Sequence, residues 1–390
     1  MRVLHVTPYF APAFGYGGPP RSVLALCKAL QRAGEAVSVI TTTADGDAEL
    51  PPAIDVPATV DDIAVTYLPR SFPKRYFRSE ALGRLLDRQA AGRDLVHIHG
   101  CWNFFGWRAA RWCHEADVPY VISPRGMLSP WSFKHGRVGK WVSYRALERS
   151  ALRHARLIHA TSRQEAQWVT ALDLGVDVVT VPNGLDDPGV LDLERAGRWR
   201  LRLGIDPNDF VILFLGRLHP KKGLETLTRA MPRVLAHVPN TTLLIVGAGE
   251  PAFVAGLHAR AEPLVTAGRI RFLGHLTGTD RRLALACADA FSLTSLSENF
   301  GMSIAEAMAA ALPVVVSRDC PWPEIDQWRA GFWVENTPAA VAAALMRLAS
   351  DRAAARVMGE NGRRAIRRHL DWTRLAGEMR RAYAQAVGSA

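Results

Sequence analysis

Two glutamates, Glu298 and Glu306, stand close together in the stretch SLSENFGMSIAEAMAAALPVVVS at residues 295–317. Carboxylates on a turn and in the first turns of a helix can accept hydrogen bonds from sugar or ribose hydroxyls. Gly301 between them lets a ligand approach the backbone closely. The amides that begin the helix attract phosphate, and they belong to Phe300, Gly301 and Met302. Glutamates also stabilise helix starts, so a bare pair favours a structural role, whereas the whole string is far more specific.

A basic run follows a strand-like segment in LFLGRLHPKKGLETL, residues 213–227. Arg217 can hold two phosphate oxygens at once, and Lys222 adds a flexible point charge. Together they could neutralise the diphosphate of a departing nucleotide. Alone, the run is typical of a solvated basic turn. Beside the Glu298 motif it favours an anion site.

Each half of the chain has a glycine-rich turn. Gly17 and Gly18 precede a helix in APAFGYGGPPRSV, and such a turn suits phosphate. It is not a dinucleotide fingerprint, because Pro20 replaces the third glycine of G-x-G-x-x-G. Residues 247–252 fit G-x-G-x-x-A, but no acidic residue follows about 20 positions later to hold a ribose. We expect a tight turn there and no NAD site.

His97 and His99 end a strand-like run in DLVHIHGCWNFFGW. Residues two apart line the same face of a strand, so both imidazoles can point the same way. A metal ion would need a third ligand, and no Asp, Glu or Cys at suitable spacing supplies one. We therefore predict no metal. Core packing and a cleft role for His99 both stay open.

A strongly basic segment covers residues 133–156 and includes Trp141. Its cations are Lys134, Arg137, Lys140, Arg145, Arg149, Arg153 and Arg156. A basic amphipathic surface with tryptophan suits an anionic membrane, and a solvated helix face explains it equally well. No recognised nucleic-acid module is present, so we expect no nucleic-acid partner.

Strand-like and helix-like runs alternate in two series. The first has strands near residues 3–7, 37–41, 63–68, 95–99, 120–123, 157–161 and 178–181. The second has strands near residues 211–215, 242–246, 270–273, 290–294 and 313–317. This alternation predicts an α/β protein with two doubly wound parallel-sheet domains. Ligands bind beyond the carboxyl ends of such strands, so two facing domains would form a central cleft. Turn chemistry and a polar stretch place the boundary near residues 182–208.

The composition agrees with this organisation. The 390 residues suit two domains, and 48% hydrophobic with 22% charged residues are typical of globular proteins. The net charge of +11 suits nucleic acid, anionic membranes or nucleotide diphosphates. The five cysteines lack CxxC or metal-ligand spacing and indicate reduced thiols. No signal peptide or membrane span is recognisable. We expect a cytoplasmic protein, with membrane contact limited to a peripheral one on the cytoplasmic face of the inner membrane.

The succession of VPNGLD, GRLHPKKG, FLGHL and SLSENFGMSIAEAMAAALPVVVS resembles the retaining glycosyltransferases of family four, which have the GT-B fold. HIHG and ISPRGML also look like members that build surface polysaccharides. The resemblance covers essentially the whole chain. It implies a metal-independent hexosyltransferase without a cofactor, whose donor is a GDP- or UDP-linked sugar. The implied acceptor is a saccharide or polyprenyl-diphosphate-linked saccharide, in exopolysaccharide, O-antigen or related glycan synthesis.

The resemblance also implies roles for individual residues. Catalysis would rest on Glu298, Arg217 and Lys222. Donor binding would add Gly17, Gly18, His275, Leu276, Asn299, Phe300, Gly301, Met302 and Glu306. Acceptor binding would involve His99, Arg125 and Gly126. Many relatives have histidine where this chain has Arg125, and arginine cannot act as a base, so their acceptor-side chemistry does not transfer directly.

The implied domains are an acceptor-binding Rossmann-like domain over residues 1–185 and a donor-binding one over residues 200–370. The last helix, about residues 372–390, is expected to pack back on the first domain. Other functions stay open at this point. They are a nucleotide-sugar epimerase or phosphorylase on a GT-B scaffold, a non-catalytic nucleotide-sugar-binding or lipid-binding protein, and a basic nucleic-acid binder.

Overall fold

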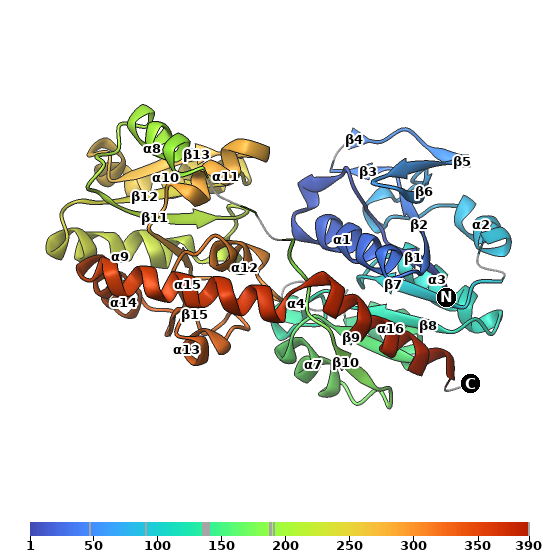
Figure 1. Cartoon of the computed structure of the whole chain (residues 1–390). Helices are drawn as coiled ribbons and strands as arrows, with labels where there is room; N and C mark the ends of the chain where they lie inside the picture. Colours follow the sequence, from blue (N-terminus) through green and yellow to red (C-terminus); the bar gives the residue numbers. More distant parts are fainter. Residues whose placement is uncertain (47, 90–91, 135–140, 187–188, 190–191, 389–390) are drawn as a thin grey trace. The chain divides into compact units, whose positions relative to one another are not determined.

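A computed structural model describes residues 1–46, 48–89, 92–134, 141–186, 189 and 192–388. The chain divides into two compact units. Unit 1 comprises Met1–Gly184 and Asp371–Ala390, and unit 2 comprises Leu185–Leu370. Each unit has its own central sheet and its own apolar core (Figure 1).

The sheet of unit 1 has eight strands in the order β10-β9-β8-β7-β1-β2-β6-β5. They are β1 (Arg2–Val6), β2 (Ala36–Thr42), β5 (Ala53–Val60), β6 (Ile63–Leu68), β7 (Leu95–His99), β8 (Tyr120–Ser123), β9 (Leu157–Ala160) and β10 (Val178–Thr180). Neighbours pair in parallel, except that β5 is antiparallel to β6. A separate hairpin joins β3 (Ala44–Asp45) and β4 (Ala48–Glu49). The central strands read as continuous apolar runs because both of their faces are buried.

Helices cover both faces of this sheet. One core packs α2 (Ala81–Gln89) and α3 (Phe104–Glu115), and the other packs α1 (Gly18–Arg32) and α16 (Trp372–Gly388). The shorter segments are η1 (Phe14–Tyr16), η2 (Lys74–Tyr76), α4 (Pro130–Lys134), the π-helical η3 (Tyr144–Glu148), α6 (Arg149–Arg153) and α7 (Arg163–Thr170). Although α16 follows unit 2 in the sequence, it belongs to unit 1 and packs beside α1.

The sheet of unit 2 has six parallel strands in the order β13-β12-β11-β14-β15-β16. They are β11 (Phe210–Leu215), β12 (Thr241–Val246), β13 (Ile270–Gly274), β14 (Ala290–Leu293), β15 (Val314–Ser317) and β16 (Gly331–Val334). Its helices are α8 (Leu193–Arg202), η4 (Pro220–Lys222), α9 (Leu224–His237), α10 (Pro251–Thr266), α11 (Gly278–Ala286), α12 (Met302–Ala309), α13 (Glu324–Trp328), α14 (Pro338–Ser350) and α15 (Arg352–His369).

Both sheets reverse their strand order at one place. In unit 2 the chain runs from β11 outward to β13 and then begins again on the other side of β11 with β14. In unit 1 the reversal lies between β1 and β7. Open α/β sheets bind ligands at such switch points, because the loops on the two sides separate there. The loops after these four strands are therefore where a site is expected.

The two parallel-sheet domains predicted from the sequence are confirmed, and every predicted strand is present. The sequence reading omitted β3, β4, β5 and β16. β5 contains Pro57 and the others are short, so none has a clear strand pattern. Within the described residues, no helix combines the length and the apolar character that crossing a membrane requires.

Candidate active site

The candidate site in unit 2 lies where the loops after β11 and β14 are tied together. Gly223 precedes α9 with a φ of 62°. Thr294 Oγ1 donates to the Gly223 carbonyl oxygen at 2.7 Å, and a Cβ on Gly223 would lie 1.7 Å from the Thr294 carbonyl oxygen. Leu296 N donates to Lys221 O at 2.8 Å. Only glycine permits so close a backbone approach, and this contact holds the two loops in register.

Lys222 and Glu298 form an ion pair across these loops. Both side chains are largely buried, with 20% and 14% exposed. Glu298 also accepts from Ser295 Oγ and Asn299 N, each at 3.3 Å. Burial by itself would raise the pKa of Glu298, but Lys222, Lys221 and the Asn299 N–H together hold that pKa below its ordinary value. Glu298 is therefore an ionised carboxylate with a fixed orientation.

Arg217 and Lys221 add positive charge to this place. Arg217 follows β11 and is exposed. Burial lowers the pKa of Lys221, Glu298 opposes that shift, and the cations of Lys222 and Arg217 lower the pKa further. All three cations belong to the segment that follows β11, and Lys221 and Lys222 are successive residues. An anion bound among them would relieve their repulsion.

The N-terminus of α12 adjoins the loop that carries Glu298. Gly301 precedes the helix with a φ of 80°, and no side chain of the described residues caps the helix. A Cβ on Gly301 would lie 2.8 Å from Ile304 Cδ1 and 3.2 Å from Glu298 Cγ. Trp322 Nε1 donates to the Phe300 carbonyl oxygen, and the two rings pack 5.2 Å apart. The first amides of α12 are thus held beside Glu298 without a competing cap, as an anion site requires.

The other donor-side candidates lie farther from the Lys222–Glu298 pair. Glu306 lies on α12, which Met302 begins, and its side chain pairs with Arg281 of α11. His275 is exposed and Leu276 is half-buried, directly after β13. Because β12 separates β13 from β11, these two residues lie farther along the same carboxyl edge of the sheet.

Sequence reasoning missed three residues that brace this region: Arg281, Trp322 and Asn336. Asn336 Nδ2 lies 3.1 Å from Thr294 O, from Ser295 O and from Asp319 Oδ2. This amide links the loops after β14 and β15. Its position has no spacing signal in the sequence, because the contact exists only once β14, β15 and β16 are neighbours.

In unit 1, Gly17 and Gly18 lie at the switch point after β1. Gly17 has a φ of 91°, and Gly18 is the first residue of α1. A Cβ on either glycine would meet no atom of the described part of the chain within 4 Å, so the backbone there is open to a ligand. Pro19 and Pro20 follow and have no N–H. This helix start consequently offers fewer amide donors than an ordinary one.

Arg125 and His99 lie at the same carboxyl edge and are bonded to each other. Both are buried, with 9% and 2% exposed. Arg125 Nη2 donates to His99 Nδ1 at 3.2 Å, and Arg125 Nη1 donates to Asn183 Oδ1 at 2.7 Å. Arginine can only donate, so His99 Nδ1 is the acceptor and His99 Nε2 carries the proton. That N–H donates to His5 Nδ1 at 2.9 Å.

Gly126 lies directly beside this network, and its N–H donates to Glu165 Oε1. Burial lowers the pKa of Arg125, and the Glu165 carboxylate is the main opposing influence. Arg125 has a φ of 55° and Gly126 a φ of 77°. Two successive left-handed residues turn the chain sharply after β8, which is how Arg125 comes to point inward.

His5 and His97 complete a buried cluster with His99, in which one ring nitrogen from each lies within 4.8 Å of the others. Sequence reasoning missed His5, because β1 and β7 become neighbours only in the sheet, where His5 pairs with His97. His97 Nδ1 lies 2.7 Å from Tyr383 Oη, and His97 Nε2 lies 3.4 Å from His159 Nδ1. Burial lowers the pKa of His5 to about 3. The histidine rings are neutral and hydrogen-bonded to one another, and the Arg125 guanidinium beside them would repel a cation. These features favour a hydrogen-bonded network over a metal site.

Residues 17–184 match the family described as "Glycosyl transferase 4-like domain", and residues 197–365 match "Glycosyl transferases group 1". A D-inositol 3-phosphate glycosyltransferase of Xylanimonas cellulosilytica is 30% identical, over 99% of this chain and 96% of that protein. The chain belongs to the family-four glycosyltransferases. The family and the enzyme class predicted from the sequence, a retaining hexosyltransferase that uses a nucleotide-sugar donor, are thereby confirmed.

This family-four glycosyltransferase has further relatives. The GDP-mannose:cellobiosyl-diphosphopolyprenol alpha-mannosyltransferase of Komagataeibacter xylinus is 26% identical, over 100% of this chain and 94% of that protein. A sucrose-phosphate synthase from Thermosynechococcus elongatus has a TM-score of 0.77 at 22% identity, covering 100% of both chains. Anabaena HepE in complex with UDP-glucose has a TM-score of 0.75 at 21% identity, covering 98% of this chain and 99% of that one. These structures establish the GT-B fold.

Proposed function

We propose that this family-four glycosyltransferase moves a hexose from a GDP- or UDP-linked donor to a saccharide or polyprenyl-diphosphate-linked saccharide, in exopolysaccharide, O-antigen or related glycan synthesis. The observation that carries the donor site is the Lys222–Glu298 pair at the switch point of unit 2. A fixed carboxylate can accept from sugar hydroxyls, while the cations beside it hold the diphosphate.

In this mechanism the bond from the anomeric carbon to the donor phosphate oxygen breaks as the acceptor oxygen bonds to that carbon on the same face. The acceptor proton passes to the departing phosphate oxygen, so no protein base is required. Negative charge grows on the leaving nucleoside diphosphate. Arg217, Lys222 and the N-terminus of α12 stabilise that charge, and such preorganised electrostatics are usually the largest catalytic term. Glu306 binds the ribose, and Asn299, His275 and Leu276 complete the donor side.

The acceptor is assigned to unit 1, where His99 ends β7, and Arg125 and Gly126 follow β8 at the carboxyl edge of the sheet. Arg125 and His99 are buried, so they position the acceptor loops through their hydrogen bonds. Gly17 and Gly18 provide open backbone for the donor phosphates. The Komagataeibacter relative, whose name gives a diphosphopolyprenol-linked saccharide as its acceptor, supports the lipid-linked class. No metal is assigned a role, because protein cations and amides supply the positive charge that stabilises the leaving diphosphate. We therefore expect full turnover in the presence of EDTA.

The site assignment is tested by replacing its charged residues. Glu298→Gln, Lys222→Ala and Arg217→Ala are each expected to lower kcat about 10²- to 10³-fold, since each removes a group that stabilises the transition state. Arg229→Ala, which removes an exposed cation from α9 of the same unit, is the matched control and retains turnover. Circular dichroism checks that all four proteins are folded. Unchanged transfer by all three site variants would contradict the assignment.

The donor is identified by thermal stabilisation with a panel of GDP- and UDP-sugars. A ligand that binds only the folded state raises Tm according to its concentration relative to Kd. The productive donor should stabilise the wild type and lose this effect in Lys222→Ala. Conversion of the donor without an acceptor would instead favour an epimerase or phosphorylase, and binding without any conversion would favour a non-catalytic binding protein.

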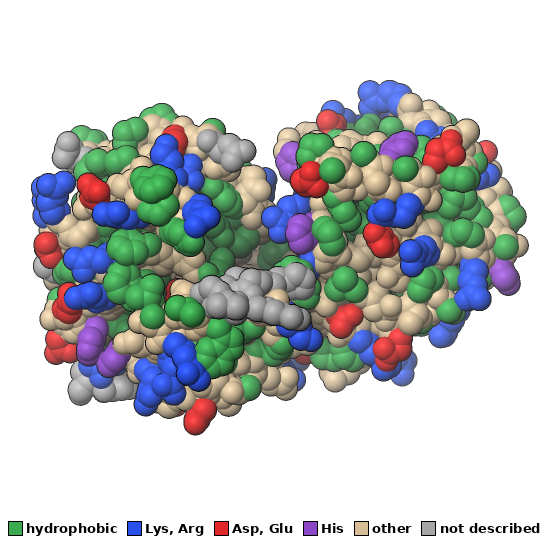
Figure 2. All heavy atoms as spheres, turned by 180° about the vertical axis from the view of Figure 1, so that it is seen from behind, with side chains coloured by type: hydrophobic (Ala, Val, Ile, Leu, Met, Phe, Trp, Pro, Cys, Tyr) green, Lys and Arg blue, Asp and Glu red, His purple; other side chains and the backbone are tan. Residues whose placement is uncertain are grey.

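Peripheral membrane binding on the cytoplasmic face of the inner membrane is a second proposal. Trp141 and Val142 are 48% and 62% exposed, and the Arg145 guanidinium lies 4.1 Å from the centre of the Trp141 ring. Lys134 and Arg149 add charge nearby in the sequence, whereas Arg137 and Lys140 lie outside the described residues. Figure 2 shows Lys and Arg dispersed among apolar side chains on one face of the molecule.

Trp141→Ala should weaken binding to anionic vesicles, and salt should weaken wild-type binding. Equal binding to neutral vesicles would contradict a role for these cations.

A further inference from the structure

Unit 1 has a second concave place, at the amino ends of its strands. On one face of the sheet, Leu4, Ile40 and Leu68 are buried beneath α2. Toward the amino ends of the strands, the same face of the sheet has smaller or polar side chains. Ser38 lies there on β2, between Leu4 of β1 and Ala64 of β6. Small side chains there leave a cavity of about 470 Å³ between the sheet and the end of α2.

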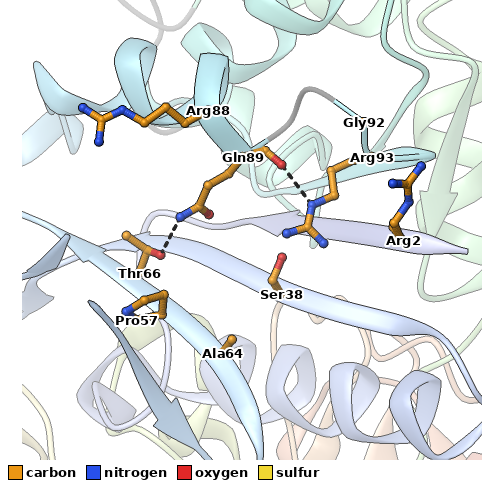
Figure 3. Close-up of a pocket in the computed structure, with 9 residues that line it drawn as sticks. All are labelled: Arg2, Ser38, Pro57, Ala64, Thr66, Arg88, Gln89, Gly92 and Arg93. Atoms are coloured by element: carbon orange, nitrogen blue, oxygen red, sulfur yellow. Dashed lines mark hydrogen bonds between the residues drawn. The ribbon is translucent and has the colours of Figure 1, made fainter. Parts of the chain in front are cut away.

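Basic and hydroxyl side chains line this amino-end pocket. Its lining includes Arg2, Arg88 and Arg93 together with the hydroxyl groups of Ser38 and Thr66 (Figure 3). Arg93 extends toward Ser38 across the pocket, while Arg88 lies at the rim with its guanidinium directed away from Ser38. Gln89, at the end of α2, donates from Nε2 to Thr66 Oγ1 at 3.3 Å, and its carbonyl oxygen accepts from Arg93 Nε at 2.9 Å. These bonds fix the pocket wall and hold Arg93 in place.

The charge of this pocket is only partly balanced. Arg2 pairs with Asp94 at 3.2 Å. Within the described ranges, no carboxylate is recorded as pairing with Arg88 or Arg93. Burial, and then the nearby Arg2 guanidinium, lower the pKa of Arg93, and the Asp94 carboxylate opposes this shift. Ser38 Oγ is fully buried and has no hydrogen-bond partner in the described part of the chain. A buried hydroxyl beside the Arg93 guanidinium is an arrangement suited to an anionic ligand.

We propose that the amino-end pocket binds a phosphate monoester. Guanidinium groups match phosphate oxygens in a bidentate manner, and the Ser38 hydroxyl can donate to a third oxygen. Pro57 and Ala64 provide apolar surface for the organic part. The cavity has the size of ordinary small-molecule sites, roughly 300–1,000 Å³, so a sugar phosphate or a similar metabolite fits.

This pocket is separate from the site proposed for transfer. It lies at the amino ends of β1, β2 and β6, whereas the substrates of open α/β sheets bind at the carboxyl ends. The phosphate monoester is therefore a ligand distinct from the donor, and saturating nucleoside diphosphate should not displace it. The same chemistry can come from a free metabolite or from the headgroup of phosphatidic acid.

Binding is measured by calorimetry with glycerol 3-phosphate and glucose 6-phosphate on the full chain, at constant ionic strength and with excess GDP or UDP present. Vesicles of phosphatidylcholine with and without phosphatidic acid form the second arm. Arg88→Gln and the double variant Arg88→Gln/Arg93→Gln should weaken binding at least tenfold. The matched control is Arg32→Gln, because Arg32 is also an exposed arginine in the last turn of a helix of unit 1. It should bind as the wild type does.

If the arginine variants lose binding to the soluble esters, the ligand is a free metabolite. If they lose binding only to the vesicles that contain phosphatidic acid, the ligand is the lipid headgroup. Arg93→Lys keeps the positive charge, so it should bind the phosphate monoester more tightly than the variant that carries Arg93→Gln. If the double variant unfolds, the Arg88 variant alone decides, since Arg88 is exposed. Wild-type affinity in Arg88→Gln, displacement of the ester by GDP or UDP, or binding in neither arm would each overturn the proposal.

Discussion

Two buried glutamates have pKa values shifted in opposite directions. Glu298 has cationic neighbours, and they lower its pKa against the effect of burial. Among the described residues, the Trp102 N–H, at 2.8 Å, and the Cys101 thiol are the partners of Glu148, and burial raises its pKa to about 7. The first glutamate is suited to bind hydroxyls as an anion. The second is a structural group that stays protonated through much of the acidic range.

Glu148→Gln should remove a pH dependence from the stability of unit 1. Above the ordinary pKa of 4.5 the unfolded chain releases this proton, whereas the folded chain keeps it until about pH 7. The free energy of unfolding of the wild type should therefore fall by at most about 3 kcal/mol across this window, relative to the glutamine variant. Thermal unfolding at pH 5 and pH 8 measures the difference. The exposed Glu80→Gln serves as control, and a Tm difference for Glu148→Gln that is the same at both pH values would refute this account.

At the scale of elements, the active site depends on how the turn before α9 meets the loop after β14. The polar groups of the site come from different strands, and a single close backbone contact at Gly223 sets their spacing. Side chains such as Asn336 and Trp322 add further bonds to the same loops. The distance between Lys222 and Glu298 therefore depends on how the turn before α9 is joined to the loop after β14.

Gly223→Ala should damage both stability and transfer. The new Cβ would lie 1.7 Å from the Thr294 carbonyl oxygen, so the two loops must move apart and Lys222 must shift from Glu298. We expect a loss of roughly 2–4 kcal/mol of stability. Gly204→Ala is the matched control, because its φ of 64° is similar but its nearest contact is Arg271 Nη2 at 3.7 Å. That variant should lose only about 1 kcal/mol. Equal stability losses in the two variants, measured by denaturant unfolding, would disprove the loop-contact argument.

At the scale of the whole molecule, the last helix completes the first unit. The buried residues of α16 share one core with α1 and with the sheet of unit 1. Tyr383 is fully buried there and contacts His97, which lies at the centre of the histidine network. Unit 1 thus requires both ends of the chain, whereas unit 2 is built from one continuous segment.

Removal of residues 371–390 should therefore destabilise unit 1 selectively, since it exposes the apolar face of α1 and leaves His97 without Tyr383. In limited proteolysis, we expect cleavage throughout residues 1–184 and survival of a fragment near residues 185–370. Tyr383→Phe, which removes only the hydroxyl, should cost about 1 kcal/mol and leave the digestion pattern unchanged. Equal resistance of both units after truncation would argue against this dependence.

Much of the fold was predictable because its signals are local. Apolar runs marked every central strand, and Gly301 marked a turn that leads into a helix. The edge strand β5 escaped prediction because Pro57 interrupts its pattern. For the site, the motif around Glu298 and the run around Lys222 were found, but their ion pair depends on two strands that are neighbours only in the sheet.

The sequence by itself indicated the family, because several short motifs, among them those around Lys222 and Glu298, follow one another as they do in the family-four glycosyltransferases, and that resemblance implied a nucleotide-sugar donor. Only the tertiary structure decided which distant groups meet. It joined His5 to His99, buried Arg125 against Asn183, and left Ser38 beneath unmatched arginines. The reason is physical: hydrogen bonds and burial depend on distances between strands, and the order of strands in a sheet is not written in any local pattern.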